Sequence, residues 1–316
     1  MSAQGIDVAF GGAAWLSGDV EGVEKWLTVL DDLKVNRIDT AAIYGASEDL
    51  LGQAGAAQRF IIDTKHPGGF TPELPTKENV IKSAMDSLEK LKTDSVDVYY
   101  LHSPDRRVNI KETLGALNEL HQRGVFKRLG LSNFLADEVE EAVRIAKENN
   151  FVVPSVYQGN YSAVARRADT EIFPTIRKHN MTFVAYSPIA GGFLSKSKAG
   201  LTDPNGRFGA GQPLAQVYNG MYNRPSFLAA LDVWEEIAEH EKISRAELAY
   251  RWVVYHSELD ASKGDFIVVG ARNAEQLKET MSSVRAGPLS EISVKKIDEL
   301  WESVKDEAGL DNLNSR

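Results

Sequence analysis

The feature that most constrains this chain is a repeated alternation of short runs rich in β-branched residues with longer amphipathic stretches. The short runs are expected strands, and eight can be placed, at Val8–Phe10, Arg37–Asp39, Phe60–Thr64, Val96–Leu101, Lys127–Leu131, Ser155–Gln158, Thr182–Tyr186 and Phe266–Val269. Strands that alternate with helices in this way pair in parallel through right-handed crossovers. The pattern therefore predicts an α/β fold, an eight-stranded parallel (β/α)8 TIM barrel, with residues 1–316 forming one domain.

The stretches between the runs carry apolar residues at the three-to-four spacing that buries one face of a helix. The clearest expected helices are Val20–Leu33, Thr76–Leu91, Ile110–Arg123 and Ala136–Asn149. Ser244 with Glu247 forms a capping-box signature for another helix, and residues 293–308 form a C-terminal helix candidate. Residues 188–225 are rich in Gly, Pro, Asn and Lys and show no sustained period. We expect a long functional loop there, after the seventh strand.

Composition and charge exclude several classes of function. With 43% hydrophobic and 26% charged residues, the chain is typical of globular proteins. Its formal net charge of -9 argues against non-specific binding to nucleic acid or to an anionic membrane. It has no cysteine, and its histidines show no metal-ligand spacing such as HExxH, so we expect no metal site. The N-terminus lacks a secretory pattern and no run of eighteen apolar residues occurs, so we expect a cytoplasmic protein.

Four polar residues sit at or just beyond the ends of expected strands: Asp39, Tyr44, Lys65 and His102. In a closed parallel barrel, the C-terminal ends of all strands open on one face, and active sites are built there. We therefore expect these side chains to meet at one mouth.

The chemistry of these residue types suggests a general acid with its supporting groups. A phenol has a pKa near ~10 and donates poorly at neutral pH. An ammonium at about 4 Å, in an effective dielectric of about 20, favours the phenolate by about 4 kcal/mol, or about three pKa units. We therefore expect Lys65 to lower the pKa of Tyr44. Asp39 can pair with Lys65, and His102 can hydrogen-bond and orient a carbonyl oxygen.

Each of these residues also has an ordinary interpretation. Asp39 can cap a turn, Lys65 can be a solvated strand-end lysine, Tyr44 can pack at a turn, and His102 can be a hydrogen-bonded strand-end histidine. A barrel hydrolase with Asp39 and Glu48 as paired carboxylates is another hypothesis. It leaves Lys65 and His102 without a role.

Several segments resemble the aldo-keto reductases, in order over nearly the whole chain. They are RIDTAAIYG, DTKHPG, VDVYYLHSPD, GLSNF, YQGNYSAVARRADTEIFP and AYSPIAGGFL. The fifth segment and the GRF at Gly206–Phe208 are most similar to the aflatoxin-aldehyde and succinic-semialdehyde reductase branch. The resemblance implies a TIM barrel, NADPH (oxidised to NADP+), and reduction of a small aldehyde or ketone to an alcohol. It makes Tyr44 the proton donor and Asp39, Lys65 and His102 its companions.

The same barrel and much of the same site also occur in cofactor-binding regulatory subunits that resemble the potassium-channel β subunits. A protein of that class would bind the nucleotide with little turnover. Nothing in this chain resembles a dedicated partner segment, so the reductase remains the first hypothesis.

A cofactor site is expected around the later strands. No GxGxxG follows a strand, whereas TIM barrels bind phosphate around the loops after strands seven and eight. Ser187, Gly191 and Gly192 lie in the first of these loops, and glycine lets backbone approach a pyrophosphate closely. The resemblance further implies that an aromatic residue stacks on the nicotinamide and that strand-end polar residues bind its carboxamide. The corresponding residues are Tyr186 and, for the carboxamide, Ser132, Asn133 and Gln158.

Arg272 opens the last helical segment, where a guanidinium and a helix N-terminus can bind a phosphate together. We expect it to hold the adenosine 2′-phosphate, although a solvated surface arginine is the plain alternative. Gln276 and Glu279 match positions that contact the adenosine end in related proteins. Thr280 stands where an asparagine is common, which weakens the expected adenine contact.

For the substrate, Trp15 is a candidate apolar wall and Arg224 a candidate partner for an acidic group. Members of the branch often pair, so a homodimer is possible.

Overall fold

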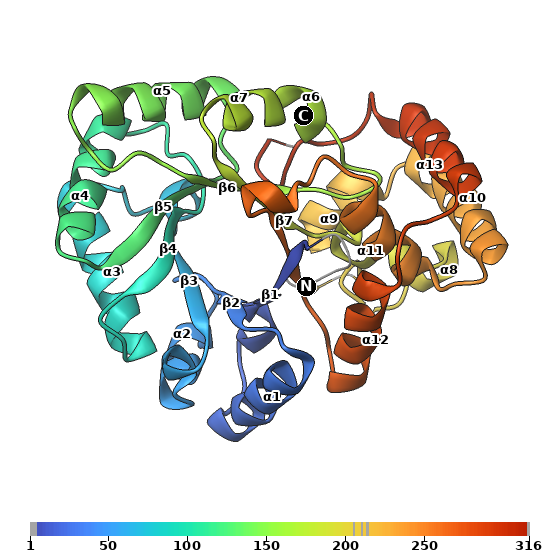
Figure 1. The fold of residues 1–316 in the computed structure, drawn as a ribbon, viewed down its shortest axis with the longest axis horizontal. Helices are drawn as coiled ribbons and strands as arrows, with labels where there is room; N and C mark the ends of the chain where they lie inside the picture. The colour runs from blue at the N-terminus through green and yellow to red at the C-terminus, as the bar shows by residue number, and fades with distance from the viewer. Residues whose placement is uncertain (1–4, 205, 210, 213–214, 315–316) are drawn as a thin grey trace.

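Eight parallel strands close into a barrel in the computed structural model, which describes residues 5–204, 206–209, 211–212 and 215–314. Each strand pairs with the next along the chain, and the eighth returns to the first (Figure 1). The strands are β1 Asp7–Gly11, β2 Arg37–Asp39, β3 Ile61–His66, β4 Val96–Leu101, β5 Phe126–Ser132, β6 Val156–Asn160, β7 Thr182–Tyr186 and β8 Phe266–Val269. The predicted (β/α)8 barrel is confirmed.

Helices surround the ring of strands, as Figure 1 shows. They are α1 Val20–Leu33, α2 Ser47–Gln53, α3 Lys77–Leu91, α4 Ile110–Gln122, α5 Ala136–Glu148, α6 Ala168–Glu171, α7 Phe173–Lys178, α8 Lys198–Leu201, α9 Ala215–Tyr222, α10 Pro225–Glu241, α11 Arg245–Tyr255, α12 Ala274–Arg285 and α13 Glu291–Val304. Local capping fixes several starts. Asp19 accepts a hydrogen bond from Gly22 N at α1, and Ser244 accepts from Glu247 N at α11. The predicted capping residue therefore begins its helix.

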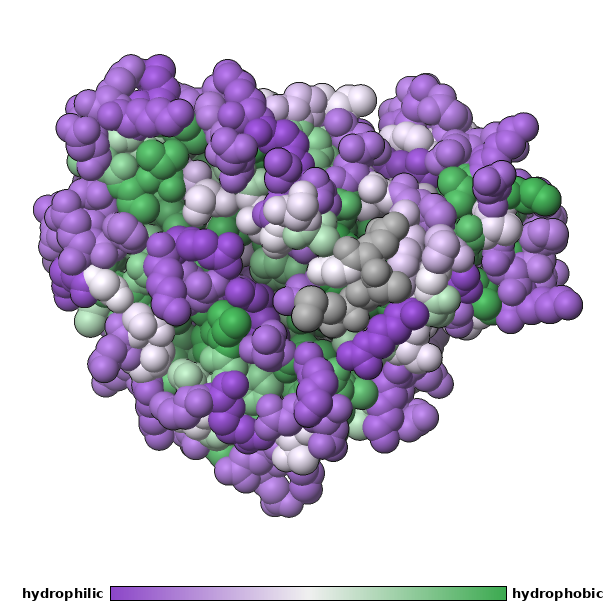
Figure 2. Space-filling view, viewed as in Figure 1, coloured by the Kyte–Doolittle hydropathy of each residue, from purple (hydrophilic) through white to green (hydrophobic). Residues whose placement is uncertain are grey.

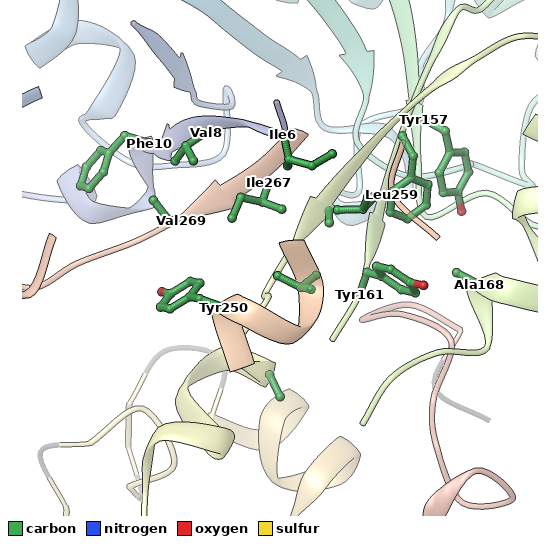
Figure 3. Close-up of a cluster of buried hydrophobic side chains, with 14 of the residues drawn as sticks. Ile6, Val8, Phe10, Tyr157, Tyr161, Ala168, Tyr250, Leu259, Ile267 and Val269 are labelled. Carbon is green, nitrogen blue, oxygen red and sulfur yellow. The ribbon is translucent and has the colours of Figure 1, made fainter. Parts of the chain in front are cut away.

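The core has two layers because successive strand residues point to opposite faces. Inside the barrel, small, branched and aromatic residues pack together, namely Ala9, Val98, Tyr100, Val156, Val184 and Phe266. The outward-facing residues pack under the helices. Figure 3 shows Val8 and Phe10 of β1 beside Ile267 and Val269 of β8, with Tyr250 of α11 outside them. The filled interior leaves chemistry to the strand ends.

The segment after β7 is more ordered than the sequence predicted. The expected loop at residues 188–225 contains a 3-10 turn, Ala190–Ser195, and the helices α8 and α9, while residues 205, 210, 213 and 214 lie outside the described part. These helices are too short to show a sustained period in the sequence. The predicted C-terminal helix is confirmed as α13, which lies alongside α10 at the side of the barrel (Figure 1).

Hydrophilic residues cover most of the outer helices on the face that Figure 2 shows. Among the residues that the structure describes, no helix has the length and apolar character needed to cross a membrane.

Candidate active site

An ion pair lies buried at the C-terminal ends of β2 and β3. Lys65 Nζ donates to Asp39 Oδ1 at 2.5 Å and to the carbonyl oxygen of Thr40 at 2.7 Å, and the lysine side chain is fully buried. Gln158 Nε2, from β6 across the barrel interior, donates to Asp39 Oδ2 at 2.8 Å. Both carboxylate oxygens are therefore paired, and the pair holds the ammonium in a fixed place.

Tyr44 lies beside this pair, in the turn that follows β2. Its backbone N–H donates to Ala41 O at 2.9 Å, and Ala46 N donates to Leu16 O at 3.1 Å. Gly45, with φ of 55°, lets the turn pass close to the loop after β1, because an added Cβ would lie 2.4 Å from Leu16 O. The turn therefore depends on glycine next to the tyrosine. It presents the Tyr44 ring with its centroid 5.4 Å from the lysine ammonium nitrogen.

The pKa of Tyr44 differs from the expectation. Burial raises the pKa of its phenol above the ordinary value, and the charge of Asp39 raises it further. The predicted lowering by Lys65 is wrong, because burial of the phenol dominates its pKa and the carboxylate of Asp39 acts in the same direction as burial. The phenol is therefore protonated at neutral pH.

His102 follows β4 and faces Tyr44. Their ring centroids are 5.6 Å apart in an edge-on arrangement, and the ring of Phe70 lies 5.1 Å from the histidine on another side. Burial lowers the pKa of His102 well below its ordinary value, and the Lys65 ammonium lowers it further. The imidazole is therefore neutral, with one N–H donor and one acceptor nitrogen. Its Nδ1 has no hydrogen-bond partner within the described residues.

The hydrolase hypothesis finds no support in this geometry. Glu48 accepts a hydrogen bond from Thr64 at 2.6 Å, while Asp39 is committed to Lys65 and Gln158. The two carboxylates are thus engaged with separate partners. Among the residues described, no group of three or more His, Asp or Glu side chains is arranged to hold a metal ion.

Three of the expected nicotinamide residues meet at the ends of β5 and β7. Asn133 has a left-handed φ of 60°, which asparagine tolerates better than most residues. Its Nδ2 donates to Ser132 Oγ at 3.2 Å, and its Oδ1 accepts from Tyr186 Oη at 2.8 Å. Gln158, predicted with this group, instead bonds Asp39. The structure thus divides the predicted carboxamide residues between two neighbouring networks.

The expected phosphate loop after β7 contains a run of unusual backbone conformations. Ser187, Gly191 and Gly192 have φ of 57°, 65° and 102°. A Cβ at Gly191 would lie 2.2 Å from the ring of Tyr218, so this position requires glycine for space as well as for conformation. The conformation of the turn is sufficient to account for both glycines. Their expected contact with the pyrophosphate stays a prediction.

The expected adenosine residues lie at the start of α12. Arg272 is exposed, and its backbone N–H donates to Gln276 Oε1 at 2.8 Å. Asn273 caps the helix by accepting from Gln276 N, and Glu279 is exposed one turn later. Thr280 is buried, so its side chain points away from solvent. An exposed guanidinium beside a capped helix start is compatible with phosphate binding.

The two substrate candidates have structural partners. Trp15 is 4% exposed and packs against Phe10 at 5.2 Å between ring centroids, and its expected role as an apolar wall for the substrate stays a prediction. Arg224 donates to the carbonyl oxygens of Gly220 and Glu307 at 2.8 and 2.6 Å. Its guanidinium therefore joins α9 to the segment that follows α13.

The sequence interpretation missed two groups beside the lysine. The carbonyl oxygen of Thr40 accepts from Lys65, and the ring of Tyr100 lies 5.5 Å from the same ammonium. Tyr100 precedes His102 by two residues, and this alternation along β4 was the available signal, because residues two apart share a strand face.

Comparisons with known proteins agree with this geometry. Residues 8–302 match the Aldo/keto reductase family. Oxidoreductase sirO of Leptosphaeria maculans is 38% identical over 291 residues, 92% of this chain and 88% of that protein. Aflatoxin B1 aldehyde reductase member 4 of Homo sapiens is 35% identical over 281 residues, 84% of each chain. Aldo-keto reductase family 7 member A3 of Homo sapiens is 34% identical over 287 residues, 85% of this chain and 86% of that protein.

An aflatoxin-aldehyde reductase among these relatives agrees with the predicted branch, and the family match spans nearly the whole barrel. The matched relatives and the family support an oxidoreductase that acts on small carbonyl compounds. The chain therefore belongs to the aldo-keto reductase family.

Proposed function

We propose that the protein reduces aldehydes or ketones to alcohols, with NADPH as the hydride donor and Tyr44 as the proton donor. The observation that carries the proposal is the fully buried Lys65 ammonium, with the rings of Tyr44 and Tyr100 beside it and Asp39 as its counter-ion. Burying a charge is costly, and such groups cluster at functional sites. Family membership supports carbonyl reduction in general.

The residues present fit a nicotinamide cofactor. Asn133 Oδ1 accepts one hydrogen bond, from Tyr186, and a carbonyl-type oxygen has room for a second donor such as a carboxamide N–H. Ser132 Oγ accepts from Asn133 and keeps its own proton to donate. The exposed Arg272 suits a phosphate. When bound, NADPH supplies a hydride to the carbonyl carbon.

The protein residues supply the proton and the local field. Burial makes the Tyr44 phenol a weaker acid, but the alkoxide that develops on the carbonyl oxygen is a still stronger base, so the protonated phenol donates its proton to that oxygen. The neutral His102 donates a hydrogen bond to the same oxygen. The ammonium of Lys65 then stabilises the phenolate that remains, while Asp39 keeps the ammonium in place.

Replacement of the tyrosine hydroxyl tests the proposal. Tyr44→Phe should lower kcat for 4-nitrobenzaldehyde by about 10²- to 10⁴-fold, because the proton donor is lost. NADPH should still quench the tryptophan fluorescence of the variant. Tyr255→Phe is a matched control, since it removes a hydroxyl that donates to Val284 O between α11 and α12. It should keep kcat/KM within about threefold. Unchanged turnover in Tyr44→Phe would refute the assigned acid.

The preference for NADPH is tested at α12. Arg272→Ala should raise the apparent dissociation constant for NADPH by about tenfold, because a charge-assisted hydrogen bond to the 2′-phosphate is lost. The dissociation constant for NADH should not change. Arg285→Ala is the control, because this arginine lies at the other end of α12 and donates to Leu33 O. An equal effect of Arg272→Ala on both nucleotides would place the 2′-phosphate elsewhere.

The regulatory-subunit hypothesis predicts a different result. Wild-type protein of that class would bind NADPH stably and show negligible turnover across aldehydes that differ in charge and bulk. A cytoplasmic location and a homodimer remain predictions, which cell fractionation and light scattering would test.

A further inference from the structure

The C-terminal segment lies against the expected nicotinamide residues. Asn314 Nδ2 donates to the carbonyl oxygen of Asn133 at 3.1 Å, and Asn312 N donates to Tyr186 Oη at 3.4 Å. These contacts join residues more than a hundred positions apart in the sequence. The end of the chain is therefore part of the surroundings of the proposed cofactor site.

Asn133 connects this segment to the catalytic residues. Its Nδ2 donates to the carbonyl oxygen of His102 at 2.9 Å and to Ser132 Oγ, and its Oδ1 accepts from the hydroxyl of Tyr186. It is buried and has a left-handed backbone conformation, so its position depends on its neighbours. A displacement of Asn133 would therefore disturb both His102 and Tyr186.

A buried carboxylate fixes the shape of the segment. Asp311 is 2% exposed, and its Oδ1 accepts hydrogen bonds from Leu313 N at 2.8 Å and from Asn314 N at 2.6 Å. Its Oδ2 accepts from Asn314 Nδ2 at 2.9 Å. The turn holds the Asn314 amide in one orientation, so its contact with Asn133 is directed rather than incidental.

A second set of hydrogen bonds joins Asn314 to the turn that follows β5 and contains Asn133. Its Oδ1 accepts from Arg106 Nη2 at 3.4 Å, and Arg106 Nε donates to Glu138 Oε1 at 2.7 Å. Glu138 Oε2 in turn accepts from Leu135 N, two residues after Asn133. The side-chain amide of Asn314 therefore uses its nitrogen on one side of the turn after β5 and its oxygen on the other.

We propose that Asn314 is a positioning residue for the reduction, which holds Asn133 in the geometry that receives the nicotinamide end of the cofactor. The inference rests on the proposed function. Asn314 acts through the backbone of Asn133, whose side chain in turn contacts the Tyr186 hydroxyl and the carbonyl oxygen of His102.

The test compares two asparagine variants that each lose one amide. Asn314→Ala should weaken NADPH binding about fivefold, as expected for the loss of one hydrogen bond, and should lower kcat as well. Asn149→Ala is the matched control, because this amide donates to Ile145 O at 2.8 Å at the C-terminal end of α5. This variant should leave the affinity for NADPH and kcat unchanged. Binding is measured by tryptophan quenching, and kcat with 4-nitrobenzaldehyde.

A double-mutant cycle separates positioning from a general structural role. Tyr186→Phe removes the hydroxyl that donates a hydrogen bond to Asn133 Oδ1. The effects of Tyr186→Phe and Asn314→Ala on the affinity for NADPH should therefore be non-additive. The pair Tyr186→Phe and Asn149→Ala should be additive. Additive effects in the first pair, or wild-type affinity in Asn314→Ala, would overturn the inference.

Two further measurements keep the result interpretable. Asn314→Leu keeps a side chain of similar shape, loses the donor to Asn133 and adds no charge beside Asp311, so it replaces the alanine variant if that protein unfolds, and it should show the same loss of affinity. Wild-type protein that binds NADPH but reduces no aldehyde would contradict the proposed function, while the affinity measurements would still decide the role of Asn314. Wild-type protein without NADPH binding would overturn both.

Discussion

The two ends of β2 and β3 carry ion pairs that differ in organisation, one half-buried and one fully buried. Arg37 and Asp63 meet toward the N-terminal end of the barrel, while Asp39 and Lys65 meet two residues further along the same strands. Two residues of a strand span about 7 Å. The two ion pairs therefore lie on the same two strands and differ in their height along the barrel axis.

The N-terminal cluster is saturated with hydrogen bonds. Arg37 Nη1 donates to both oxygens of Asp63 and to Asp97, each at 2.8 Å. Arg128 donates to Asp97 at 2.6 Å, and Val98 N donates to Asp63 at 3.1 Å. Four adjacent strands contribute to this network, which ties the barrel together at that end.

The C-terminal cluster leaves a buried polar atom unused. Both oxygens of Asp39 are paired, yet in the described part of the chain His102 Nδ1 has no partner. Unsatisfied buried polar atoms are rare in native proteins and call for an explanation. The difference teaches that one ion pair stabilises the barrel, whereas the other maintains a charge beside groups that are available to a ligand.

The largest expected effect comes from breaking the C-terminal pair. Lys65→Met should lower kcat by more than about 100-fold, because Tyr44 loses the charge that stabilises its phenolate. It should also lower the free energy of unfolding by about 3–5 kcal/mol, since Asp39 remains buried without its counter-ion. Steady-state kinetics and urea denaturation measure the two effects.

A double variant separates these two consequences. Asp39→Asn combined with Lys65→Met removes both charges, so the free energy of unfolding should recover while kcat stays low. Recovery of activity together with stability would show that the pair acts only through folding.

Breaking the N-terminal pair should lower the stability of the protein and leave its activity nearly unchanged. Arg37→Met leaves Asp63 buried with a single backbone donor, so we expect a loss of about 3 kcal/mol in unfolding free energy. In the folded protein, kcat/KM should stay within about threefold of wild type. Arg37→Lys keeps the charge and should lose less stability. A 100-fold loss of kcat/KM in Arg37→Met would erase the distinction between the two clusters.

The sequence predicted the fold better than the electrostatics. The alternation of strands and helices was sufficient for the barrel, and strand-end positions were sufficient to bring Asp39, Lys65 and His102 near Tyr44. The pKa of Tyr44 was mispredicted because the sequence does not show how deeply the phenol is buried, and burial is the largest cause of the raised pKa.

Contacts between distant segments were also beyond the sequence. Gln158 reaches Asp39 across the barrel, and Asn314 reaches Asn133 from the end of the chain. Neither residue stands in a local pattern that specifies its partner. The contact of the Trp15 ring with Phe10 is likewise visible only in the packing.

The smallest expected effect concerns His66, which follows Lys65 in the sequence. His66 is buried, and its Nδ1 accepts a hydrogen bond from Gly68 N at 3.0 Å. Burial lowers the pKa of His66 to about 4, although Asp105 opposes this shift. An unfolded histidine titrates near ~6.5, so the unfolded chain binds the proton first as the pH falls. The stability that depends on neutral His66 is therefore present above pH ~6.5 and is lost progressively below it.

This titration distinguishes His66 from the saturated N-terminal cluster. His66→Asn keeps an acceptor for Gly68 N and does not titrate, so wild type should lose about 2 kcal/mol relative to this variant between pH ~7 and ~5. Urea denaturation at several pH values in this range measures the difference. Parallel pH dependence in both proteins would show that the histidine is not held neutral. In that case a proton can enter the C-terminal end of β3 without cost, and this end of the barrel would tolerate added charge beside the Lys65 ammonium.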